Sequence, residues 1–163
     1  YEISACLVGS EMCIRDSLGM VGGQTLDMQS EDKPVDLDTL EQIHKAKTGA
    51  LLQFAVLSAA DIAKVDKSTS QALEDFSNHM GLMFQIKDDL LDVYGDESKL
   101  GKKVGSDIEN HKSTYVSLLG KDGAEDKLNF HKDAAIKSIE QLSSHYDIKP
   151  LLDIVELFYT RDH

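Results

Sequence analysis

The chain has 163 residues, of which 41% are hydrophobic and 28% charged, as in a globular protein with one domain and one core. No apolar run approaches the roughly 18 residues that a bilayer span requires, so we expect no membrane segment. The formal net charge of −12 argues against a general nucleic-acid binder, because phosphate backbones demand a positive protein surface.

Residues 1–17 show neither a helical stripe nor the alternation of a strand. The run ACLVGSEMCIRDS resembles a translated adapter sequence, so we interpret 1–17 as a non-native leader. The alternative is a genuine but irregular N-terminal arm. Both cysteines, Cys6 and Cys13, lie in this stretch, so we expect no disulfide framework and predict a reducing, cytoplasmic location.

Two helical patterns follow the leader. Residues 18–31 indicate the end of a helix, on which Gln24 and Asp27 share a face. Its glycines match neither common phosphate-loop fingerprint and equally fit close helix packing. After a break at 31–34, Asp36 or Asp38 is expected to cap a helix that runs to about residue 63. The apolar stripe of that helix is Leu40, Ile43, Leu51 and Phe54.

Lys47 falls in the middle of this apolar stripe. An unpaired ammonium is expensive to bury, so the side chain must reach solvent or meet an anion. Thr48 and Gly49 both weaken a helix interior, and a kink there would aim Lys47 into a cavity. The alternative is a lysine that reaches solvent from an ordinary helix.

The third helix, capped by Ser68 or Thr69 and ending near Tyr94, carries an acidic face opposite an apolar stripe, which is formed by Leu73, Phe76, Met80, Met83 and Leu90. Carboxylates crowded on one face repel each other unless a cation lies between them. After Gly95 a loop supplies lysines, which suits Mg²⁺ together with a diphosphate; the alternative is a solvated acidic face. The acidic face, within an arc of about 100°, is formed by Gln85, Asp88, Asp89 and Asp92, and the loop and its end contribute Lys99, Lys102, Lys103, Asp107 and Lys112.

The remainder reads as packing elements without chemistry: a short helix over 113–119, a turn at 120–123, a helix over 124–144 and a last helix from Pro150 to Phe158. The six histidines are scattered and have no cysteine partner, so zinc is not expected. The expected core positions of the long helix are Leu128, Ala135, Ile139 and Leu142.

From residue 18 onward the chain resembles the C-terminal part of the trans-isoprenyl diphosphate synthases, most of all the bacterial farnesyl diphosphate synthases. The matching segments, in order, are GMVGGQTLDM, HKAKTGALL, FQIKDDLLDVYGD, LGKKVGSDIENHKSTY and FYTRDH. The resemblance implies an all-α, truncated isoprenoid-synthase fold with a deep cavity between helices. It also implies Mg²⁺ as cofactor, allylic and isopentenyl diphosphates as substrates, and a homodimer for a full-length parent.

The resemblance further assigns roles to residues of this chain. Asp88 would be the most direct magnesium ligand, and Lys47 and Lys102 would hold the allylic diphosphate. The implied metal ligands are Asp88, Asp89 and Asp92; the implied catalytic residues are Lys47, Thr48 and Gln85; and the implied substrate-binding residues are Gln24, Asp27, Lys47, Lys102, Asp107 and Lys112.

The chain also departs from the family. Members carry a first aspartate-rich motif and an isopentenyl diphosphate site N-terminal to residue 18, whereas 88–92 is the only DDxxD here. His111 replaces a usual glycine and Val116 a frequent proline. We therefore expect a fragment with half a site and no synthase activity alone. The alternatives are a non-catalytic subunit of a heteromeric prenyl synthase and an acidic helical interaction module.

Overall fold

The computed structural model describes residues 19–31, 33–96 and 112–162, and these ranges contain helices and no strand, which confirms the all-α class. The predicted leader and the loop residues Lys99, Lys102, Lys103 and Asp107 lie outside the described residues. The elements are α2 (Met20–Gln29), α3 (Leu37–His44), η1 (Lys45–Gly49), α4 (Ala50–Ala63), α5 (Lys67–Tyr94), α8 (Tyr115–Glu140), η2 (Gln141–Ser144) and α9 (Lys149–Thr160).

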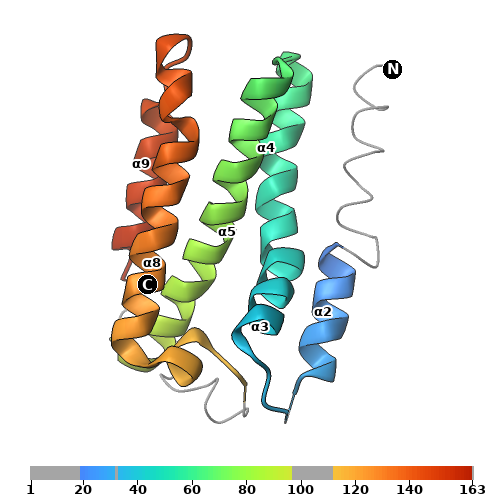
Figure 1. The fold of residues 1–163 in the computed structure, drawn as a ribbon, viewed down its shortest axis with the longest axis vertical. Coiled ribbons are helices and arrows are strands. Elements are labelled where there is room, and N and C mark those ends of the chain that lie inside the picture. The colour runs from blue at the N-terminus through green and yellow to red at the C-terminus, as the bar shows by residue number, and fades with distance from the viewer. Residues whose placement is uncertain (1–18, 32, 97–111, 163) are drawn as a thin grey trace.

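Helix α5 is the centre of the bundle (Figure 1), and it contacts α4 on one side and α8 and α9 on the other. Its predicted apolar stripe is largely buried, from Phe76 through Met83 to Leu90. The four core positions predicted for α8 and η2 are buried as well and pack in the same cluster as the α5 stripe. None of the helices in the described ranges is both long and apolar enough to cross a bilayer.

The helix ends follow capping chemistry. The Asp36 side chain accepts a hydrogen bond of 2.8 Å from the Thr39 amide and so starts α3, as one of the two predicted caps. The cap predicted for α5 is wrong, because Asp66 precedes both expected residues and its carboxylate accepts from the Ser68 and Thr69 amides at 2.8 and 3.0 Å. The end of α5 at Tyr94 is confirmed.

The interruption expected near Lys47 is a turn of π-helix, η1, between α3 and α4. Such a turn contains an additional residue, so it rotates everything that follows relative to a continuous α-helix. Leu40 and Ile43, before the turn, are buried as predicted. Leu51, after it, is 45% exposed while Ala50 is buried, so the predicted stripe is wrong at Leu51.

In the C-terminal half the predicted turn at 120–123 is reduced to Gly120, because residues 121–123 are helical. Gly120 has φ 72° and ψ 178°, a left-handed conformation that glycine adopts without strain, and it divides α8 at the expected turn. Thr114 starts α8 through a reciprocal pair of hydrogen bonds with Ser117. Pro150 lies in the first turn of α9, where its missing N–H costs nothing.

Candidate functional site

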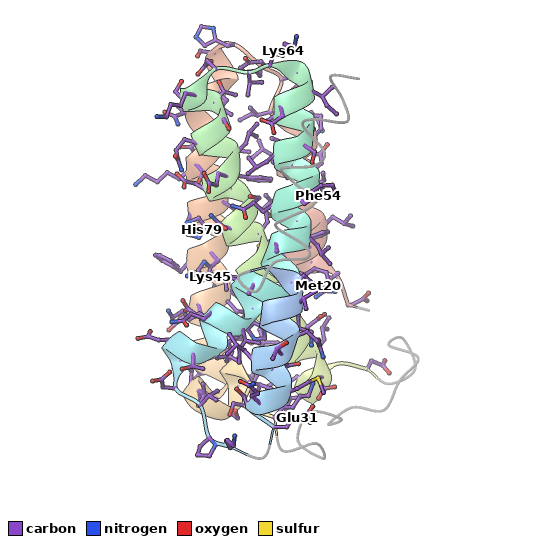
Figure 2. All side chains as sticks on the ribbon, turned by 90° about the vertical axis from the view of Figure 1, so that its right-hand side faces the viewer. Met20, Glu31, Lys45, Phe54, Lys64 and His79 are labelled. Carbon is purple, nitrogen blue, oxygen red and sulfur yellow. The ribbon has the colours of Figure 1, made fainter. Side chains whose placement is uncertain are left out.

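The candidate site lies where α2 crosses the π-turn, in the half of the bundle that contains Met20, Glu31 and Lys45 and opposite the Lys64 end (Figure 2). Gly23 makes this crossing possible. A Cβ at Gly23 would lie 2.4 Å from the backbone nitrogen of Lys47, closer than Cβ atoms approach other atoms in real structures. The close approach places Asp27, one turn further along α2, beside the Lys47 side chain.

Lys47 meets an anion, as one of the two predicted solutions requires. Its Nζ lies 2.6 Å from Asp27 Oδ2, and its side chain is 33% exposed. Lys112 Nζ lies 3.7 Å from the same oxygen. Burial by itself would raise the pKa of the Asp27 carboxyl, but the Lys47 hydrogen bond and the charges of Lys112 and Lys47 outweigh it and hold that pKa below its usual 3.8. Asp27 is therefore a firmly ionised partner for both lysines.

A second glycine crossing joins the π-turn to α5. A Cβ at Gly81 would lie 2.9 Å from the Gly49 Cα, so the two backbones touch here. One turn along α5, Gln85 Oε1 accepts a 3.0 Å hydrogen bond from the Thr48 hydroxyl. Gln85 Nε2 in turn lies 3.4 Å from Asp88 Oδ2. The crossing thus connects two predicted catalytic residues to the aspartate motif.

The three aspartates of the motif are not equivalent. Asp89 is buried and accepts a 2.7 Å hydrogen bond from the Tyr115 amide at the start of α8. Asp92 is buried too, so the alternative of a solvated acidic face is wrong for these two residues. The Asp88 side chain is 41% exposed and is the most open of the three. Within the described ranges, no cluster of three or more His, Cys, Asp or Glu is placed to hold a metal ion.

Arg161, just after α9, contacts the motif and was missed by the sequence analysis. Its Nη2 pairs with Asp88 Oδ1 and donates a 2.9 Å hydrogen bond to the Phe84 carbonyl. Its guanidinium also lies over the Phe84 ring at 4.0 Å. One signal could have found it, since Arg161 is the only arginine after residue 17 in a chain that otherwise uses lysine.

Two rings close to the site, one partly buried and one fully buried, were also missed. His44 stacks on Tyr115 with ring centroids 5.7 Å apart. Both His44 ring nitrogens and the Tyr115 hydroxyl are buried without a hydrogen-bond partner in the described part of the chain. Burial lowers the pKa of His44 to about 4 and raises that of Tyr115, so both rings are neutral near pH 7.

The described side chains form two polar strings that meet at neighbouring residues of the π-turn. Lys112, Asp27 and Lys47 form one string, and Thr48, Gln85, Asp88 and Arg161 form the other. Gln24 is exposed on α2 and joins neither string, while Lys102 and Asp107 lie outside the described residues. Residues from three helical segments (α2, η1 and α5), together with Lys112 before α8 and Arg161 after α9, therefore converge on the π-turn and the end of α5.

The chain is similar to known proteins over most of its length. The model of the polyprenyl synthetase family matches residues 7–150. A farnesyl diphosphate synthase from Bacillus subtilis is 46% identical over 145 residues, which are 89% of this chain and 48% of the relative. The chain thus spans about half the length of the curated relatives it matches.

Solved structures show the same fold. An FPP/GFPP synthase from Zymomonas mobilis superposes with a TM-score of 0.77 at 28% identity, over 96% of this chain and 51% of that one. A geranyltransferase from Helicobacter pylori, complexed with magnesium and isoprenyl diphosphate, gives 0.75 at 28% identity, over 94% and 50%. These matches confirm the predicted isoprenoid-synthase fold, and the family match over most of the sequence shows that the chain belongs to the polyprenyl synthetase family.

Proposed function

We propose that this chain provides the diphosphate- and magnesium-binding part of a farnesyl-type prenyltransferase, which condenses an allylic diphosphate with isopentenyl diphosphate. One observation carries the proposal. Lys47 in the π-turn and the open Asp88 on the facing helix α5 belong to adjoining polar strings, and Thr48 and Gln85 connect the π-turn to Asp88. The relatives named farnesyl diphosphate synthase support the choice of reaction.

The donor set fits magnesium. Mg²⁺ takes one or two protein carboxylates and completes its shell with water and phosphate oxygens, so a closed cluster of three carboxylates is not required. Asp88 offers a half-exposed carboxylate, and we propose it as the direct ligand. Asp92, one turn further on, and Asp89, which is fixed by the Tyr115 amide, would support it. Bound magnesium would supply positive charge to stabilise the departing diphosphate.

The amines are proposed to hold the diphosphate. Lys47 is one-third exposed and is oriented by Asp27, so its ammonium is accessible to phosphate oxygens at the π-turn. Lys112 shares the Asp27 carboxylate and would face the same ligand. We retain Gln24, Lys102 and Asp107 as proposed substrate-binding residues on the basis of the resemblance.

Thr48 and Gln85 are proposed to act on the charge that develops as the allylic C–O bond breaks. The Thr48 hydroxyl donates to the Gln85 amide oxygen, which fixes the orientation of both groups before substrate arrives. The Thr48 carbonyl and the Gln85 amide would then face the allylic cation as preorganised dipoles. The alkene of isopentenyl diphosphate attacks this cation, and loss of a proton completes the condensation.

The proposal is tested by calorimetric titration of a non-cleavable allylic thiodiphosphate into the chain, with Mg²⁺ present at about 100 times its Kd so that the metal site is filled. Asp88→Asn and Lys47→Gln should each abolish most of the binding, because each removes a charge that contacts the ligand. Asp75→Asn, which alters an exposed aspartate on the same helix, is the matched control and should bind as the parent does. Equal binding by all four proteins would refute the site.

We also propose that the isolated chain makes no prenyl product, because it contains a single DDxxD. A Mg²⁺-dependent condensation assay on this chain, if positive, contradicts that part of the proposal. Homodimerisation of a longer parent and a cytoplasmic location stay predictions.

A further inference from the structure

The anchors of Arg161 are mostly independent of Asp88. The arginine donates to the Phe84 carbonyl at 2.9 Å and lies 4.0 Å over the Phe84 ring. Phe84 also meets Phe158 of α9 edge-on, with centroids 5.3 Å apart, which fastens the end of α9 to α5. The Arg161 side chain is only 16% exposed. These contacts hold the guanidinium in one place whether or not Asp88 is present.

Asp88 is the more exposed partner of the two. Its Oδ1 is paired with Arg161, and its Oδ2 has one described neighbour, Gln85 Nε2, at the long distance of 3.4 Å. A half-exposed carboxylate bound on one oxygen by a fixed guanidinium loses the freedom to rotate. Its second oxygen is then held on the Gln85 side of the helix, which faces the π-turn.

We propose that Arg161 is a positioning residue for Asp88: it binds one carboxylate oxygen from outside the metal shell and leaves the other oxygen for the cation. The inference rests on the proposed function, since it takes Asp88 as the metal ligand. Hydrogen-bond partners of ligating side chains commonly contribute 10- to 100-fold in metal affinity. Metal affinity at α5 therefore depends on the docking of α9.

If Arg161 acted only through its charge, its removal would change the metal affinity in the opposite direction. If Arg161 were only a competing cation, its removal would free Asp88 and eliminate a positive charge, and metal binding would tighten. If it positions Asp88, removal releases the carboxylate and metal binding weakens. The direction of change in affinity thus separates the two roles.

The test measures Mn²⁺ binding to the full 163-residue chain by electron paramagnetic resonance, with no substrate and no turnover. Arg161→Gln should weaken Mn²⁺ binding by about 10-fold or more. Lys149→Gln is the charge-matched control, because Lys149 is an exposed cation on α9 whose partner is Asp153, and it should not change the affinity. Asp88→Asn reports on the metal site itself and should abolish the same binding.

Arg161→Lys keeps the positive charge and tests the positioning role if Arg161→Gln does not fold. A lysine ammonium lacks the planar guanidinium that stacks on Phe84, so positioning predicts weaker Mn²⁺ binding than the parent shows. Unchanged or tighter binding by the folded Arg161 variant overturns the inference. Absence of Mn²⁺ binding by the parent, or no effect of Asp88→Asn, instead refutes the proposed metal site, and the positioning role with it.

Discussion

A pair of histidines makes the main helix contact of the bundle sensitive to acid. His79 of α5 and His131 of α8 lie with their Nδ1 atoms 2.9 Å apart and their ring centroids 5.2 Å apart, so each ring points this nitrogen at the other. A hydrogen bond between them needs one proton, carried by one ring and accepted by the other. A second proton on the pair would put a hydrogen on both facing nitrogens and break the bond, and a charge on His131 would be buried because that residue is 4% exposed.

The size of the effect follows from the pKa of His131, which burial and the neighbouring His79 lower from 6.5 to about 4. The unfolded chain gains a proton near pH 6.5 and the folded chain only near pH 4, so this contribution to stability is complete above pH 6.5 and is lost as the pH falls toward 4. The expected loss at pH 5 is about 2 kcal/mol for His131. Burial lowers the pKa of His44 to the same value, so the two together give about 4 kcal/mol.

The assay is urea unfolding of the parent and of His131→Asn at about pH 7.5 and about pH 5. Asparagine can still hydrogen-bond to His79 but does not titrate, so between the two pH values this variant should lose about 2 kcal/mol less unfolding free energy than the parent loses. Carboxylates that titrate in the same range are common to both proteins and cancel in the comparison. His145→Asn, at an exposed position, should behave as the parent does. An equal loss in His131→Asn and the parent would refute the reasoning.

Three further predictions concern the site. Gly23→Ala should lower the free energy of unfolding, measured in urea, by about 1–3 kcal/mol, because the added Cβ would clash with the Lys47 backbone. Gly49→Ala is the control and should not be destabilising, because the nearest atom to its added Cβ is 3.5 Å away. Asp89→Ala should cost about 1–3 kcal/mol even without metal, since it leaves the buried Tyr115 amide unpaired, and an unchanged unfolding curve would contradict that role. Mg²⁺ at one hundred times its Kd should add about 2.7 kcal/mol to the free energy of unfolding in urea, and EDTA should remove the gain. An unfolding curve that neither Mg²⁺ nor EDTA changes would contradict the metal site.

Most of the fold could be predicted from local signals. Apolar periodicity located the helices, and the ends set by Asp36, Gly95, Gly120 and Pro150 follow from short-range chemistry. The prediction failed at Leu51 because the π-turn changes the helical phase, and a sequence period has no means of showing an inserted residue.

Site residues could be predicted only where the sequence pattern that identifies them lies within one predicted helix. Lys47 was identified because an ammonium on an apolar stripe demands a partner, and Asp88 because it belongs to a motif on a single face. The identity of the partner of Lys47, and the contact of Arg161 with Asp88, depend on which helices cross and where. The crossings depend on glycines, whose close contacts are visible only in three dimensions.

The pairing of Lys47 with Asp27 explains how the lysine is tolerated in the absence of a ligand. An isolated ammonium on this stripe would oppose folding, but a half-buried carboxylate at 2.6 Å satisfies it. A diphosphate that binds Lys47 must therefore replace or share Asp27 as its partner. The gain in free energy at Lys47 is then the difference between its interaction with the diphosphate and its interaction with Asp27. Since Lys112 contacts the same carboxylate, that exchange leaves Asp27 with a cation and leaves no uncompensated charge at the site.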